Sequence, residues 1–295
     1  MLLSGTSVMA AGAFVLGAGT AATTVGTSVM TTAHASYHRP SAAFLTEARG
    51  ALVKYLRDNH PQAIHAAPIG HHAGPANVTA TGSYNWGGYA DVSSTDGTFT
   101  KVSGKWTTPA VTCTNEDTIT SEWVGLDGYG SDTVEQDGTI GWCFEDVPTY
   151  FTWYEMYPAG TVEVGTSLAP GDVITASVVA TATGHYTLKL TDATNTANSF
   201  TEHATCAVTT CLDLSAEWIA ERPSFSIGIA PLADYNKWKL TLGNETASGV
   251  AGTIGSYADV DSVQSVDATD SYALANPSAL SGNNNTFTTT WLNSY

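Results

Sequence analysis

The spacing of hydrophobic residues predicts one short helix near the start of the chain. Between residues 40 and 59 the apolar side chains return at helical intervals and form one face: Phe44, Leu45, Ala48, Leu52, Tyr55 and Leu56. Ser41 is placed to cap this helix, and the stretch Asn59-His60-Pro61 would end it. No segment after residue 60 keeps a helical period, so the remainder is expected to form strands and turns.

From residue 82 onward, short runs rich in Val, Ile, Thr, Tyr and Trp alternate with Gly, Asp, Asn, Ser and Pro. This texture is typical of antiparallel strands joined by turns. Strands are predicted over residues 98–106, 122–127, 150–157, 172–181, 185–191, 216–221, 224–229 and 237–242. No change of composition divides residues 79–295. We therefore predict a single all-β domain there, a two-sheet antiparallel β-sandwich.

The first 35 residues have the features of an export signal. They carry no charged side chain, and residues 9–22 are apolar and small. Ala33-His34-Ala35 is an A-x-A cleavage pattern, so we predict a signal peptide over residues 1–35. Gly and Thr interrupt the apolar run too often for a permanent membrane anchor. The sequence therefore predicts a secreted, extracellular protein that does not stay bound to a membrane after processing.

Residues 36–78 differ in charge from the rest of the chain and are predicted to be a propeptide. Residues 1–78 hold four Lys and Arg against two acids, whereas residues 79–295 hold six against 25. The predicted helix is followed by residues 66–75, which have the composition of a linker. Opposite charges predict that the propeptide docks on the domain and inhibits it. A plain exposed N-terminal tail is the alternative.

The overall composition excludes several classes of protein. A net charge of −17 leaves no basic face for nucleic acid. The 8 Trp, 13 Tyr and 8 Phe predict a packed core rather than disorder. A domain with many acids and few cations avoids strong self-repulsion when its carboxylates protonate, which favours work in acid. A merely soluble acidic surface is the alternative.

Four cysteines in an exported chain predict two disulfides. Three pairings are possible. We favour Cys206–Cys211, which closes a short loop and leaves Cys113–Cys143. We expect no metal in catalysis, because the domain has only two histidines and no Cys/His spacing fits zinc. Calcium held by oxygen ligands alone stays open, since the domain has 25 acids.

Carboxylates and amides beside aromatic residues are the remaining candidates for chemistry. The chain has no G-x-S-x-G motif and no glycine-rich phosphate loop. Alternate residues share one face of a strand, and acids recur with apolar neighbours on such faces: Trp123 with Asp127, Trp153 with Glu155 and Tyr157, and Glu217 with Ile219 and Glu221. This recurrence predicts a concave sheet that binds a ligand.

These stretches together resemble the glutamic peptidases, or eqolisins, a family of acid endopeptidases. The resemblance covers about residues 82–295 and rests on N-W-G-G, W-V-G-L-D-G, a Gln shortly before a Gly, W-Y-E-x-Y-P and A-E-W-I-x-E, in that order. It implies a concanavalin-like jelly roll with a Gln/Glu catalytic pair on its concave face. Carried over by motif, the pair is Gln136 and Glu217, with Glu221 as the alternative glutamate. The implied substrate-binding or supporting residues are Trp86, Trp123, Asp127, Trp153, Glu155 and Glu221.

A Gln/Glu pair suits peptide hydrolysis in acid. Glutamate, with a reference pKa of about 4.3, can take a proton from water and return it to the leaving amine. A neutral Gln can donate to the oxyanion and orient the water. The resemblance therefore predicts a monomeric endopeptidase that acts on protein and peptide substrates without a cofactor.

The alternative is a β-sandwich glycoside hydrolase, with Glu155 and Glu217 as its carboxylates, or a carbohydrate-binding module. The predicted propeptide argues against both, since a peptidase must be kept inactive until it is exported and a binding module rarely needs an inactive form.

Overall fold

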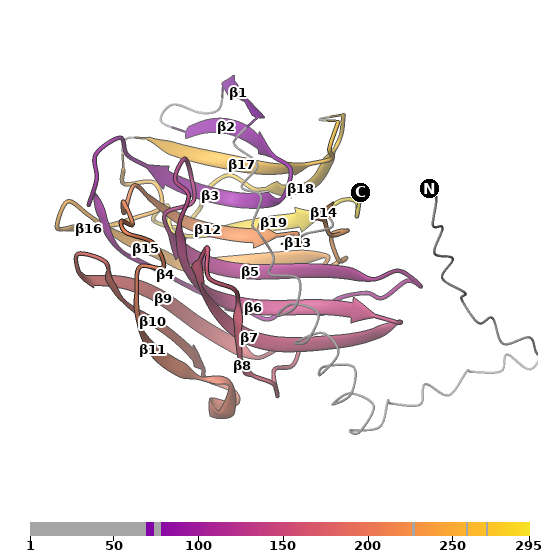
Figure 1. Cartoon of the computed structure of the whole chain (residues 1–295). Coiled ribbons are helices and arrows are strands. Elements are labelled where there is room, and N and C mark those ends of the chain that lie inside the picture. The colour runs from indigo at the N-terminus through magenta and orange to yellow at the C-terminus, as the bar shows by residue number, and fades with distance from the viewer. Residues whose placement is uncertain (1–68, 74–77, 226–227, 258, 270) are drawn as a thin grey trace, which may run out of the picture. The chain divides into compact units, whose positions relative to one another are not determined.

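The computed structural model describes residues 69–73, 78–225, 228–257, 259–269 and 271–295 (Figure 1). The predicted signal peptide and the predicted helix lie outside these residues. Part of the predicted linker lies among the described residues. Ile69–Ala73 forms strand β1, which pairs antiparallel with β2 (Val78–Ser83). A stretch that we expected to be a soft connection therefore contains a sheet strand.

The first sheet runs from β1 at one edge to β8 at the other (Figure 1). Its order after β1 and β2 is β17 (Val260–Val266), β3 (Trp86–Val92), β12 (Ser215–Glu221), β5 (Thr118–Leu126), β6 (Val134–Phe144), β7 (Val147–Tyr157) and β8 (Val162–Gly165). Its neighbours are antiparallel except β2 and β17, which run parallel. Strands β5, β6, β7 and β12 thus lie side by side in its middle.

The second sheet has the order β16 (Val250–Thr253), β15 (Lys237–Ala247), β4 (Phe99–Thr107), β9 (Val173–Ala182), β10 (His185–Asp192) and β11 (Phe200–Thr205). The first residues of β15 pair instead with β19 (Phe287–Trp291), which β18 (Ala273–Pro277) connects to β17. The remaining elements are the small hairpin β13 (Ser224–Phe225) and β14 (Gly228–Ile229), and a 3-10 turn at Thr196–Asn198. The all-β architecture is confirmed.

Both faces of the first sheet are buried, as β12 shows. Ala216, Trp218 and Ala220 point into the large apolar cluster that includes side chains of both sheets. The alternate residue Ile219 belongs to a second cluster on the opposite face, together with Trp86, Trp123 and Trp153. The acids of β12 alternate in step with Ile219, so Glu217 and Glu221 lie on this second face.

Seven of the eight predicted strands are confirmed. The described residues hold ten further strands that were not predicted: β1, β2, β3, β6, β8, β11, β16, β17, β18 and β19. Residues 224–229 form the two paired strands β13 and β14, not one strand. Strand β6 was not predicted at all, because Asp137-Gly138 has the composition of a turn. In the structure Gly138 lies within β6, where a Cβ atom would lie 2.2 Å from the carbonyl oxygen of Glu122. Close approach of a neighbouring strand, not a turn, requires this glycine.

The favoured cysteine pairing is confirmed. Cys113 is bonded to Cys143, and Cys206 is bonded to Cys211. The first bond ties the segment before β5 to the end of β6, and the second closes the loop that leads into β12. The two bonds thus fix chain segments on both sides of the central strands.

Candidate active site

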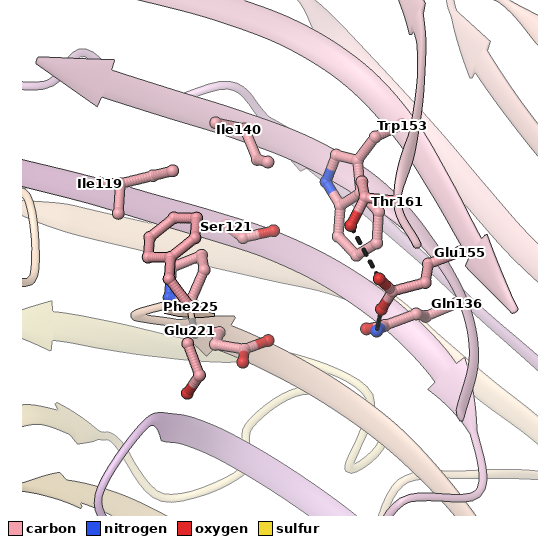
Figure 2. Close-up of a pocket in the computed structure, with 11 residues that line it drawn as sticks. Ile119, Ser121, Gln136, Ile140, Trp153, Glu155, Thr161, Glu221 and Phe225 are labelled. Atoms are coloured by element: carbon pink, nitrogen blue, oxygen red, sulfur yellow. Dashed lines mark hydrogen bonds between the residues drawn. The ribbon is translucent and has the colours of Figure 1, made fainter. Parts of the chain in front are cut away.

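A pocket lies on the second face of the first sheet, over β5, β6, β7 and β12 (Figure 2). One part of its wall is apolar: Ile119, Ile140, Trp153, Pro223 and Phe225. The other part is polar: Ser121, Gln136, Glu155, Thr161, Glu221 and Ser224. An apolar pocket with a few converging polar groups is the usual form of a ligand site.

Gln136 and Glu155 face each other across β6 and β7, where they are register partners. The Nε2 of Gln136 donates to Oε2 of Glu155 at 2.7 Å, and the hydroxyl of Thr161 donates to Oε1 at 2.8 Å (Figure 2). Burial raises the pKa of Glu155 to about 7, although both hydrogen bonds act to lower it. Glu155 therefore fixes which end of the Gln136 amide is nitrogen.

Glu221 is held at the other side of the pocket by two donors. The indole Nε1 of Trp123 donates to Oε2 at 2.8 Å, and the Nδ2 of Asn85 donates to Oε1 at 3.1 Å. Burial raises the pKa of Glu221 to about 7, and the carboxylate of Glu155 adds to that rise. The two hydrogen bonds oppose it by favouring the charged form.

Glu217 lies on the same face of β12 but does not line the pocket. It pairs in register with Gly125 of β5, whereas Glu221 pairs with Ser121. Its side chain is buried. Burial raises its pKa well above the ordinary value. Of the two glutamates considered from the sequence, Glu221 lines the pocket that Gln136 also lines, and Glu217 does not.

Residues 84–290 match the Peptidase A4 family. The chain belongs to this family. The family comprises the glutamic peptidases, or eqolisins, so the resemblance drawn from the motifs is confirmed and the chain is a peptidase of the glutamic type. A glycoside hydrolase or a carbohydrate-binding module is not favoured.

Individual relatives agree with this assignment. Aspergillopepsin-2 of Aspergillus niger is 27% identical over 197 residues, which are 59% of this chain and 67% of that protein. Scytalido-glutamic peptidase, solved with a transition state analog inhibitor, matches with a TM-score of 0.60 and 24% identity over 71% of this chain and 98% of its own. SCP-B, an eqolisin in complex with the tripeptide Ala-Ile-His, matches with a TM-score of 0.56 and 22% identity over the same shares. The two structures show that the fold is shared.

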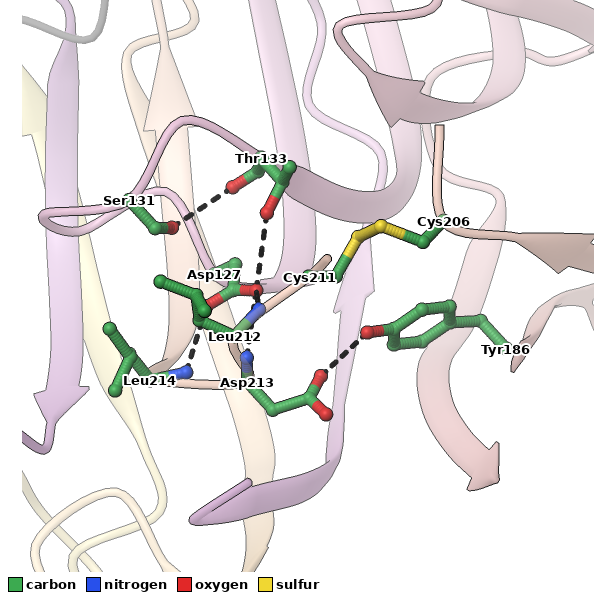
Figure 3. The surroundings of a disulfide bond; sticks show 9 residues. All are labelled: Asp127, Ser131, Thr133, Tyr186, Cys206, Cys211, Leu212, Asp213 and Leu214. Carbon is green, nitrogen blue, oxygen red and sulfur yellow. Dashed lines mark hydrogen bonds between the residues drawn. A yellow bond between two sulfur atoms is a disulfide. The ribbon is translucent and has the colours of Figure 1, made fainter. Parts of the chain in front are cut away.

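Asp127 of this glutamic peptidase lies outside the pocket and holds a loop. It directly follows β5 with a φ of 66°, which ends the alternation that would place it beside Trp123. Its carboxylate accepts the backbone N–H groups of Leu212, Asp213 and Leu214, each at 2.8 Å (Figure 3). Asp127 therefore fixes the chain just before β12.

The three predicted tryptophans take different positions. Trp153 lines the pocket. Trp123 reaches it through the bond to Glu221, and Trp86 packs edge-on against Trp123 with ring centroids 5.1 Å apart. Sequence reasoning missed Asn85 and Thr161. Asn85 directly precedes Trp86 in the N-W-G-G stretch, whereas no pattern in the sequence marks Thr161.

No helix among the described residues is long and apolar enough to cross a membrane.

Proposed function

We propose that this peptidase is an acid endopeptidase in which Gln136 and Glu221 form the catalytic pair. One observation carries the choice of glutamate: Glu221 lines the same pocket as Gln136, and Glu217 does not. Two N–H donors also hold the Glu221 carboxylate in place. Such fixed orientation is what a general base needs, since its reach to the water decides its efficiency.

In the proposed reaction, ionised Glu221 takes a proton from a water molecule as the water attacks the substrate carbonyl. The Nε2 of Gln136 carries two hydrogens, and Glu155 accepts one of them. The second is left to donate to the carbonyl oxygen as it becomes an oxyanion. Protonated Glu221 then returns its proton to the leaving nitrogen. Glu155 acts as a positioning residue for the Gln136 amide.

The test compares Gln136→Ala, Glu221→Gln and Glu217→Gln on a denatured protein substrate from about pH 3 to about pH 7, because burial raises the pKa of Glu221 to about 7 and its ionised form grows over this range. Circular dichroism checks that each variant is folded. We expect the first two to lose at least about 10²-fold in kcat/KM, since each removes an oxyanion donor or the base. Glu217→Gln is expected to stay within about threefold of the parent. If Glu217→Gln is inactive while Glu221→Gln keeps its activity, then Glu217 is the base and the proposal is wrong.

Secretion and latency complete the proposal. The charge-free segment with its A-x-A pattern supports export, and so do the two disulfides of the domain. The basic segment ahead of the acidic domain supports inhibition by the peptidase's own propeptide. N-terminal sequencing of the protein secreted by an expressing cell tests both cleavage steps.

A further inference from the structure

A second group of acids lies away from the pocket, around the Cys206–Cys211 disulfide (Figure 3). It consists of Asp127 after β5, Glu135 near the start of β6 and Asp213 in the loop before β12. One carboxylate oxygen from each of the three can be chosen so that all lie within 4.8 Å of one another. Three chain segments thus bring negative groups to one point.

The three carboxylates differ in the hydrogen-bond donors that surround them. Asp127 accepts three backbone N–H groups and the Thr133 hydroxyl. Asp213 accepts the hydroxyl of Tyr186 at 2.7 Å (Figure 3). Glu135 is fully buried, and no other described residue donates a hydrogen bond to either of its carboxylate oxygens. A buried carboxylate without a donor is strongly unfavourable unless another group compensates it.

The electrostatic surroundings do not supply that compensation. The charged groups that act most strongly on Glu135 are Asp127 and Asp213, both of the same sign as itself. The carboxylates of Asp127 and Glu135 also act to raise the pKa of Glu217 on β12. Burial and these two carboxylates raise the pKa of Glu135 to about 10, so a cation that binds there replaces the proton of Glu135 and neutralises the cluster.

The donor atoms select the kind of cation. Calcium binds oxygen ligands at about 2.3–2.6 Å, so two oxygens on one ion are at most about 5 Å apart. The three chosen oxygens lie within 4.8 Å of one another, so all of them can bind one such ion. Zinc prefers nitrogen and sulfur, but the nearby sulfurs are joined in a disulfide. Magnesium demands a stricter octahedron and keeps most of its water.

We propose that Asp127, Glu135 and Asp213 bind a calcium ion that has a structural role. The ion joins the end of β5 and the start of β6 to the loop between Cys211 and β12, which carries Asp213. That loop leads directly into β12, so the site stabilises the position of the strand that carries Glu221. The proposal is independent of the catalytic assignment, because none of its three ligands lines the pocket.

The test measures thermal unfolding of the full chain at pH 6 with EGTA, with 10 mM calcium or with 10 mM magnesium. A Gln136→Ala background prevents self-digestion. Glu135→Gln keeps the shape of the side chain and removes its charge. Glu122→Gln is the matched control, since Glu122 is also buried but accepts hydrogen bonds from Thr120 and Thr139.

Sites with a Kd of about 0.1–1 mM should raise the parent's unfolding temperature by roughly 3–8 °C in 10 mM calcium. The Glu122→Gln control should keep this rise and Glu135→Gln should lose it. Magnesium should have less effect. Terbium luminescence excited through Tyr186 gives a second readout, and Asp213→Asn replaces Glu135→Gln if that variant does not fold. A parent that calcium does not stabilise, or a calcium effect that survives in Glu135→Gln, would overturn the proposal.

Discussion

Replacing Glu122 by glutamine should make the fold more resistant to rising pH. Glu122 lies on β5 and is buried, where its oxygens accept the hydroxyls of Thr120 at 2.9 Å and Thr139 at 3.2 Å. Burial raises the pKa of Glu122 from its ordinary 4.5 to about 7, while the hydroxyls lower it. The folded protein therefore holds this proton more tightly than the unfolded chain does.

The sign of the effect follows from linkage. A raised pKa in the fold contributes stability that is fully present below about pH 4.5 and is lost as the pH rises through about 7. The difference between the two pKa values corresponds to about 3.4 kcal/mol, of which about 3 kcal/mol is lost by pH 7. Glutamine is neutral at every pH and can stay within hydrogen-bond reach of both hydroxyls.

The assay is urea unfolding followed by tryptophan fluorescence between pH 4 and pH 7, in the Gln136→Ala background. Glu122→Gln should match the parent within about 1 kcal/mol at pH 4. At pH 7 it should be more stable than the parent by about 3 kcal/mol. Asp96→Asn, a change at an exposed turn, is the control and should follow the parent at both pH values. A Glu122→Gln curve parallel to the parent over the whole range would refute the reasoning.

Two further predictions concern the site and the propeptide. Trp123→Phe removes a hydrogen bond that lowers the pKa of Glu221, so the acid limb of kcat/KM should move up by about one pH unit. Trp153→Phe, whose indole N–H has no partner among the described residues, should leave that limb in place. A synthetic peptide of residues 36–75 should inhibit the mature enzyme more strongly at pH 6 than at pH 3, and salt should weaken it; equal inhibition at all pH values would indicate apolar docking instead.

Four strands of the second sheet, β4, β9, β10 and β15, could be predicted because buried residues alternate along most of each. The edge strands β11 and β16 have no fully buried residue and were not predicted. Strand β10 alternates buried and more exposed residues along its length, and β4 and β9 do so over most of theirs, so the period of two is visible in the sequence. Strand β6 is buried on both sides over residues 134–141 and contains Gly138 and Gly141. Its pattern shows neither alternation nor a continuous apolar run. Only the neighbouring backbone of β5 explains why glycine is needed there.

Which of Glu217 and Glu221 lines the pocket could not be predicted from the sequence. Strand alternation correctly places both on one face, but it does not say which end of β12 lies under the pocket. That depends on the register with β5, which sets Ser121 opposite Glu221 and Gly125 opposite Glu217. The register joins segments far apart in the chain, and no local pattern encodes it.

The position of Asp127 shows a related limit. A period of two places Asp127 on the face of Trp123, but the period holds only while the chain stays extended. The strand ends at Leu126 and Asp127 takes a φ of 66°, so its carboxylate meets the loop before β12. Asn and Asp tolerate this conformation better than most residues, yet a W-V-G-L-D-G motif does not reveal it.

Two buried glutamates on opposite faces of the first sheet, Glu221 and Glu122, need opposite protonation states. On the pocket face, the proposed base Glu221 acts only when it is ionised, and its pKa of about 7 means that this form grows as the pH rises. On the other face, Glu122 must stay protonated for the fold to keep its stability. Catalysis should therefore be limited from below by Glu221 and from above by unfolding. If so, Glu122→Gln should extend the alkaline limb of kcat/KM and leave the acid limb where it is. A variant that is more stable at pH 7 but loses activity at the same pH as the parent would show that chemistry, not unfolding, sets the upper limit.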